Sequence, residues 1–241
     1  ERFLPAIDRN ITVDDVFEYH TDGLLRGNIL EFKKMINDVN SVLFQAIHYL
    51  SHMRIQGRRI PKNIILISLN NAKAYVYDSE DYLQSIEKTY TGAASTNVSG
   101  FAASKAKYTL DYTTSDDDEN TLIDILKEEN YTKVHIDEDC IVGWAKTYYR
   151  ENPTARKSDF LGEETGKVKI IGEIRNPTKL KDAIYPYEGK TNIKFKYLMD
   201  KLNDDIQKKN LGAFYTPEKY VEKAIELLRT AIARVPEGND Y

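Results

Sequence analysis

The segment 28–33, Asn-Ile-Leu-Glu-Phe-Lys, constrains the fold of this chain more than any other stretch. Its apolar residues and its length are typical of a β-strand. Residues two apart on a strand share a face, so Glu31 and Lys33 are expected to point the same way, with Phe32 on the opposite face toward a core. The pattern therefore predicts a strand that presents a carboxylate and an ammonium together.

Asp22 precedes Glu31 in the chain, and Gly23 and Gly27 lie between the two acids. Glycines in such a gap suit a tight turn between paired strands. We therefore expect a hairpin that returns Asp22 to the side of Glu31. The alternative is an exposed hairpin whose charges are merely solvated.

Asp22, Glu31 and Lys33 together suit phosphodiester hydrolysis. Magnesium takes hard oxygen ligands and keeps several waters, so one or two carboxylates suffice to hold it. The metal lowers the pKa of an attacking water, and a neighbouring lysine positions that water or stabilises charge on the phosphate. The three residues are thus a candidate magnesium-dependent nuclease site, with Asp22 and Glu31 as metal ligands.

The next segment, Asn37–Arg54, has apolar residues at helical spacing. Gln45 and Tyr49 fall on a neighbouring stripe of this predicted helix. His48 and His52 are one turn apart, but the chain has no His-Glu-x-x-His motif there, which argues against zinc. The apolar stripe consists of Val39, Val42, Leu43, Ala46, Ile47, Leu50 and Met53.

Further elements complete an α/β pattern. The apolar run Asn63–Leu69 predicts a strand buried on both faces, and Ala74–Tyr77 predicts another strand. A hairpin, a helix and two more strands imply a mixed sheet flanked by helices. Helices are also predicted at 79–90, 121–129, 139–150 and 193–209, and a strand at 168–174. A basic cluster that would either contact phosphates or simply be solvated comprises Arg54, Arg58, Arg59 and Lys62.

Composition limits the class of protein. The chain has 241 residues, 41% of them hydrophobic and 30% charged, with no apolar run of membrane-spanning length. Cys140 is the only cysteine, so an internal disulfide is impossible, which fits a cytoplasmic location. The formal net charge of -4 argues mildly against nucleic acid as a partner, but DNA binding depends on local charge.

The combination of Asp22, Glu31-x-Lys33 and a helix with Gln45-x-x-x-Tyr49 resembles the PD-(D/E)XK nuclease superfamily. The resemblance is to the subgroup whose helix glutamine and tyrosine sit beside the metal. It implies a restriction-endonuclease-like mixed sheet, metal binding by Asp22 and Glu31, and a catalytic role for Lys33. It also implies that Gln45 and Tyr49 support the site or contact DNA.

Near the end of the chain, Thr216 is a good N-cap and Pro217 a good first residue for an amphipathic helix reaching about Arg234. We expect its apolar stripe either to fold back onto the preceding helix or to pair with a neighbouring molecule. The segment Phe214-Tyr215-Thr216-Pro217 resembles the opening of adenine-specific DNA methyltransferases, in which these residues pack against S-adenosylmethionine. No Asn/Asp-Pro-Pro-Tyr/Phe motif occurs in the sequence, so we expect no methylation or cofactor binding by this chain itself.

The two resemblances together predict the N-terminal part of a fused type II (type IIG-like) restriction-modification enzyme. The expected parts are a nuclease-like domain at 1–110, a helical connector at 111–210 and the first methyltransferase helix at 211–241. Double-stranded DNA is the expected partner and Mg²⁺ the cofactor, with S-adenosylmethionine needed only by the full-length parent. The rival hypotheses are a catalytically silent DNA-docking domain of an adenine methyltransferase and a helical scaffold without chemistry.

Overall fold

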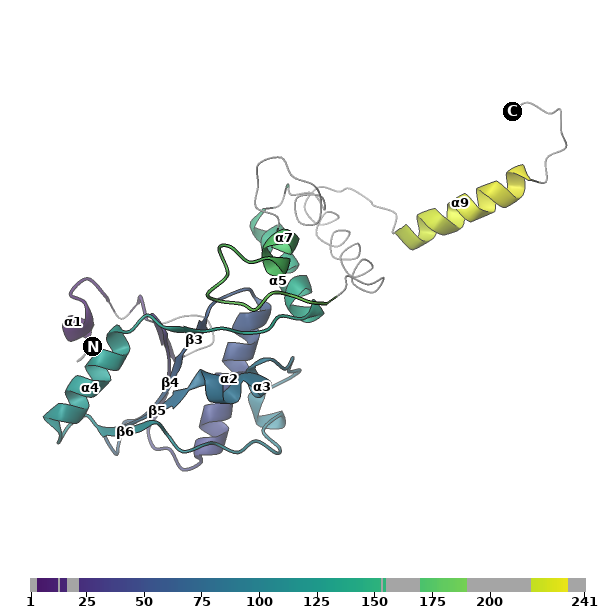
Figure 1. Cartoon of the computed structure of the whole chain (residues 1–241). Coiled ribbons are helices and arrows are strands. Elements are labelled where there is room, and N and C mark those ends of the chain that lie inside the picture. Colours follow the sequence, from purple (N-terminus) through teal and green to yellow (C-terminus); the bar gives the residue numbers. More distant parts are fainter. Residues whose placement is uncertain are drawn as a thin grey trace.

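A mixed five-stranded sheet forms the centre of the structure (Figure 1). The structure is a computed structural model, and it describes residues 4–12, 14–16, 22–152, 154, 170–189 and 218–233. The strand order is β1-β2-β4-β5-β6. Only β2 and β4 run parallel, and the other neighbouring pairs are antiparallel. The predicted α/β class and mixed sheet are therefore confirmed. The strands are β1 (Gly23–Leu25), β2 (Asn28–Lys33), β4 (Asn63–Ser68), β5 (Lys73–Asp78) and β6 (Tyr108–Asp111).

The hairpin expected between Asp22 and Lys33 is present as β1 and β2. Its register pairs Gly23 with Leu30 and Leu25 with Asn28, which leaves a two-residue turn at Arg26 and Gly27. Arg26 adopts a positive φ of 52°. A β-carbon on Gly27 would overlap the backbone of Asn130, so this position requires glycine because another part of the chain approaches it closely.

Helix α2 (Val39–Ile55) connects the parallel strands β2 and β4 and covers one face of the sheet. Asp38 caps its N-terminus by accepting a hydrogen bond from the backbone N–H of Asn40. The predicted apolar stripe faces the sheet, as its spacing requires. The helix residues buried in this core include Leu43, Ala46, Ile47, Leu50 and Met53, and the strand residues include Ile29, Ile64 and Leu66.

Helices α1 (Leu4–Ile7) and α4 (Asp116–Lys127) cover the opposite face of the sheet (Figure 1). Helix α4 begins earlier than the predicted 121–129, because Ser115 accepts from the N–H of Asp118 and caps the helix there. The acidic run 116–119 therefore forms the first turn, where it interacts favourably with the helix dipole. The second core contains Leu30, Ile65, Ile67, Val76, Leu110, Leu122 and Leu126.

Two further predicted elements differ in the structure. The predicted strand at 168–174 is wrong, because the described part of that segment belongs to helix α7 (Ile170–Arg175). Ile174 is fully buried there, and Glu173 accepts backbone hydrogen bonds from residues 178–180. The helix predicted at 79–90 is shorter and consists of η1 (Ser79–Tyr82) and α3 (Leu83–Ile86).

The remaining elements extend the first core well beyond the central sheet. Ile141, Ala145, Ile174 and Ile184 are buried together with residues of α2 and β4. Residues on both sides of position 110 thus share one core, while the proposed domain boundaries themselves stay a prediction. These elements are β3 (Ile60–Pro61) paired with β7 (Tyr131–Thr132), η2 (Ala94–Thr96), and α5 (Glu138–Glu151).

Helix α9 (Glu218–Ile232) is amphipathic, as expected, and its apolar residues Val221, Ile225, Leu228 and Ile232 are exposed. The predicted helix 193–209 and the residues Phe214, Tyr215, Thr216 and Pro217 lie outside the described residues. In the part of the chain that the structure describes, no helix has the length and apolarity to cross a bilayer.

Candidate active site

Asp22, Glu31 and Lys33 meet on the face of the sheet that α2 covers. The Nζ atom of Lys33 lies 3.3 Å from Oε2 of Glu31 and 3.6 Å from Oδ2 of Asp22. The two carboxylate oxygens cannot be farther apart than the sum of these distances. This separation is below the roughly 8 Å beyond which one magnesium ion with a shared water would fail to connect them.

The register of the hairpin explains why the three side chains meet. Gly23 pairs with Leu30, so the next antiparallel position places Asp22 opposite Glu31 on the same face. The backbone N–H of Phe32 donates a hydrogen bond of 2.8 Å to Oδ2 of Asp22. The strand backbone therefore holds the Asp22 carboxylate in place beside Glu31.

Glu31 is in an unusual electrostatic environment. Its side chain is fully buried, and burial together with the nearby Asp22 carboxylate raises the pKa of Glu31 to about 7, although Lys33 acts to lower it. Its Oε2 accepts from Lys33, whereas Oε1 is buried with no hydrogen-bond partner among the described residues. Leaving such an acceptor unsatisfied costs about 1–3 kcal/mol.

These features fit a hard divalent cation. Two carboxylates face a single ammonium group, so the ionised site has a net negative charge that a cation would offset, and Glu31 Oε1 is an oxygen with no hydrogen-bond partner among the described residues. Within the described ranges, no group of three or more Asp, Glu, His or Cys side chains is arranged to hold a metal. A metal here would therefore keep several of its waters, as magnesium commonly does.

Gln45 and Tyr49 lie on α2, which covers the face carrying Glu31 and Lys33. Gln45 Nε2 donates to the Tyr49 hydroxyl at 3.1 Å. Both residues line a pocket between α2 and the segment 93–98, together with Ser41, Val42 and His48. In the described structure no hydrogen bond or ion pair joins them to the Asp22–Glu31–Lys33 group. Their expected supporting or DNA-contacting role stays a prediction.

The predicted basic cluster is not intact as a surface, because one of its four members, Arg54, is buried. Arg54 is one of the most deeply buried side chains, with only 2% of its surface exposed, so a role for it in contacting phosphates is ruled out by its position. Lys62 is paired with Asp78 at 3.6 Å and Glu80 at 3.0 Å. Arg59 lies over the ring of Tyr131. The sequence could not reveal that the first of these charges is directed inward.

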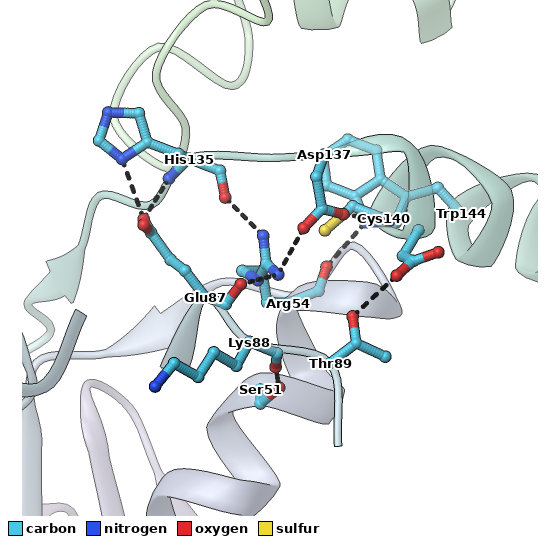
Figure 2. Close-up of polar contacts among 10 residues, drawn as sticks. Ser51, Arg54, Glu87, Lys88, Thr89, His135, Asp137, Cys140 and Trp144 are labelled. Carbon is cyan, nitrogen blue, oxygen red and sulfur yellow. Dashed lines mark hydrogen bonds and ion pairs between the residues drawn. The ribbon is translucent and has the colours of Figure 1, made fainter. Parts of the chain in front are cut away.

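Arg54 instead joins three segments at the C-terminal end of α2, as Figure 2 shows. Its guanidinium donates to the carbonyl oxygens of His135 at 2.8 Å and Glu87 at 2.7 Å, and to the Asp137 carboxylate at 2.9 Å. The Arg54 carbonyl in turn accepts from Trp144 Nε1 at 2.8 Å. This cluster stabilises the packing of α2 against the 87–89 segment and α5.

The other contacts in Figure 2 reinforce the same junction. Glu87 Oε1 accepts from the backbone N–H of His135 and lies 3.0 Å from its ring Nδ1. Asp137 also caps α5 through the N–H of Cys140. Burial acts to raise the pKa of Asp137, but the Cys140 N–H and Arg54 outweigh it, so this pKa lies below its usual value.

Ser68 is a polar residue near the candidate site that the sequence analysis did not single out. It is fully buried at the end of β4, and its register partner on the parallel strand β2 is Lys33. Its Oγ has no hydrogen-bond partner among the residues described. The available signal was its place as the first polar residue after the apolar run 64–67, at the carboxyl end of a buried strand.

Comparisons with models of protein families, with curated proteins and with solved structures found no match to this chain.

Proposed function

We propose that this chain is a metal-dependent endonuclease with a PD-(D/E)XK-like fold that hydrolyses phosphodiester bonds of double-stranded DNA. The observation that carries the proposal is the meeting of Asp22, Glu31 and Lys33, with Lys33 Nζ within 3.6 Å of both carboxylates. The mixed sheet with a helix crossing between its parallel strands supports it, because this arrangement presents the three groups on one face.

Each residue has a distinct role in this proposal. Asp22 and Glu31 would hold a magnesium ion, and Glu31 has an oxygen, Oε1, without a hydrogen-bond partner among the described residues. When bound there, the ion would supply a lowered pKa for the attacking water and positive charge to offset that of the phosphate. The ammonium of Lys33 orients that water and stabilises the negative charge that builds on the phosphate oxygens as the bond to the leaving oxygen breaks. Gln45 and Tyr49 support the site or contact the DNA.

The resemblance of Phe214–Pro217 to adenine methyltransferases extends the proposal to the parent protein. The parent would be a type II restriction-modification enzyme that also methylates adenine with S-adenosylmethionine. The candidate nuclease residues do not include this segment, so cleavage and methylation would depend on separate parts of the protein. The rival function, a silent DNA-docking domain, predicts no cleavage.

The test is an assay of supercoiled plasmid and genomic DNA with the purified chain. We expect nicking or cutting with MgCl₂ and none with EDTA or with Asp22→Asn. A DNA panel of diverse sequence is needed because type II enzymes cut only at their own sites. Cleavage that persists in EDTA, or that Asp22→Asn retains in full, would refute the proposed site. Binding of duplex DNA without cleavage of any panel member would favour the docking function.

A further inference from the structure

Metal binding at the candidate site creates a problem for Lys33. Its ammonium already lies 3.3 Å from Glu31 Oε2 and 3.6 Å from Asp22 Oδ2. A divalent cation held by the same two carboxylates would stand close to this ammonium, and like charges at such a distance repel each other. The ammonium must therefore move off one or both carboxylates, and it then needs another hydrogen-bond acceptor.

The structure offers one such acceptor on the neighbouring strand. Lys33 and Ser68 are register partners on the parallel strands β2 and β4. Neighbouring strands are about 4.8 Å apart, and paired residues share a face. The flexible four-carbon chain of a lysine spans this spacing. Asp22 precedes β1, which lies on the opposite side of β2 from β4. A move toward β4 therefore takes the ammonium farther from Asp22 but keeps it on the face that carries the site, where its other two N–H donors remain for the attacking water.

The state of Ser68 Oγ fits this role. A hydroxyl has two acceptor lone pairs, yet this one is buried and has no hydrogen-bond partner among the described residues. The Ser68 backbone carbonyl accepts a 3.3 Å hydrogen bond from the Tyr112 hydroxyl. The side-chain Oγ makes no hydrogen bond with any described residue. Buried polar atoms without partners are rare in folded proteins, so this one calls for an explanation.

We infer that Ser68 is a positioning residue for Lys33: when a metal occupies the two carboxylates, the Lys33 ammonium transfers its hydrogen bond from Glu31 to Ser68 Oγ. The inference rests on the proposed function, since it assumes a metal at Asp22 and Glu31. It assigns to Ser68 no contact with the metal or the DNA. Ser68 would raise the affinity of the site for the metal by accepting a hydrogen bond from the displaced Lys33 ammonium.

The test is a double-mutant cycle on metal affinity. The probe is Mn²⁺, which prefers the same oxygen ligands as Mg²⁺ and whose free form gives an EPR signal. The proteins are the wild type, Ser68→Ala, Lys33→Met and the double variant. We expect Ser68→Ala to weaken Mn²⁺ binding at least about tenfold, which corresponds to the loss of one hydrogen bond to a charged donor. In the Lys33→Met background the same change should have no effect.

Ser79→Ala is the matched control, because Ser79 is also fully buried but its hydroxyl donates to the Pro61 carbonyl at 2.8 Å. Ser79→Ala should lower the melting temperature and leave Mn²⁺ affinity unchanged. Ser68→Ala should weaken Mn²⁺ binding without lowering the melting temperature, since it removes a hydroxyl that has no hydrogen-bond partner among the described residues.

Two results would overturn the inference in distinguishable ways. If the wild type binds Mn²⁺ and Ser68→Ala leaves the affinity unchanged, or weakens it equally with and without Lys33, the role of Ser68 is refuted and the proposed nuclease site stands. If the wild type binds no Mn²⁺ at all, the proposed metal site fails and the inference fails with it.

Discussion

The backbone N–H of Phe32 donates a 2.8 Å hydrogen bond to the Asp22 carboxylate, so the first candidate metal ligand is fixed by the strand that carries the second. Asp22 is partly exposed, whereas Glu31 is fully buried. One carboxylate is thus open to solvent and the other lies at the base of the site. This difference determines how each residue is expected to respond to substitution.

Asp22→Ala and Asp22→Asn should separate the two roles of Asp22. Both variants should lose Mg²⁺ binding in titration calorimetry, because both remove the ligand charge. Asp22→Asn retains a carbonyl oxygen that can accept from Phe32, so its free energy of unfolding should stay near that of the wild type. Asp22→Ala should lose about 1 kcal/mol from the missing hydrogen bond. Mg²⁺ binding by Asp22→Ala equal to the wild type would show that the metal site has been assigned wrongly.

The stability of the metal-free protein should depend on the ionisation of Glu31. The pKa of Glu31 is raised from 4.5 to about 7 in the folded state, so the folded protein holds a proton that the unfolded chain releases. The contribution of Glu31 is therefore fully present below pH 4.5 and is lost as the pH rises to 7, on the order of 3 kcal/mol.

Urea denaturation in EDTA across this pH range tests the dependence. The difference in free energy of unfolding between the wild type and Glu31→Gln cancels the other titrating groups. This difference should change steadily between pH 4.5 and 7 and level off above 7, with the wild type losing stability relative to the variant. A difference that is flat with pH would mean that Glu31 titrates normally.

Arg54 should matter for stability and not for DNA binding. Arg54→Met removes the donor to two backbone carbonyls and to Asp137, and should lower the free energy of unfolding by about 3 kcal/mol. Arg59→Met is the control with the same loss of charge. Arg59 is exposed, so this variant should lose less than about 1 kcal/mol. Equal denaturation midpoints for the two variants would contradict the structural role of Arg54.

Gly27→Ala should destabilise the hairpin that carries the site. A β-carbon at this position would overlap the main chain of Asn130, which cannot move aside as a side chain could. We expect a loss of about 2 kcal/mol in urea denaturation and faster amide exchange in β1 and β2. A matched change at Gly92, where the nearest atom to a β-carbon is 3.5 Å away, introduces backbone strain without a clash and should cost less.

The parts of the fold that followed from the sequence are those fixed by local periodicity. Strand β2, the buried strand β4 and helix α2 appear close to their predicted bounds, because alternation and helical spacing report directly on which residues face a core. The meeting of Asp22 and Glu31 was also predictable, since a short turn leaves few registers for a hairpin.

Features that depend on contacts distant in the sequence were not predictable. The apolar residues of segment 168–174 are compatible with a strand as well as with a helix. In the structure Ile174 belongs to helix α7 and is buried in the core that α2 forms with the sheet. Arg54 looked like a surface charge because its partners, Glu87, His135 and Asp137, are far along the chain. The position of Ser68 at the end of a buried strand could be read from the sequence, but its place beside Lys33 depends on the pairing of β2 with β4.

The most direct test of the nuclease assignment introduces Lys33→Ala into the proposed full-length restriction-modification protein and measures DNA cleavage and DNA methylation. Lys33 contacts both candidate metal ligands, whereas methyl transfer would use residues elsewhere. We predict that Mg²⁺-dependent cleavage of duplex DNA falls by at least about a hundredfold, as for removal of one transition-state-stabilising group, while adenine methylation continues at the wild-type rate. Wild-type cleavage by Lys33→Ala, or an equal loss of both activities, would contradict the assignment.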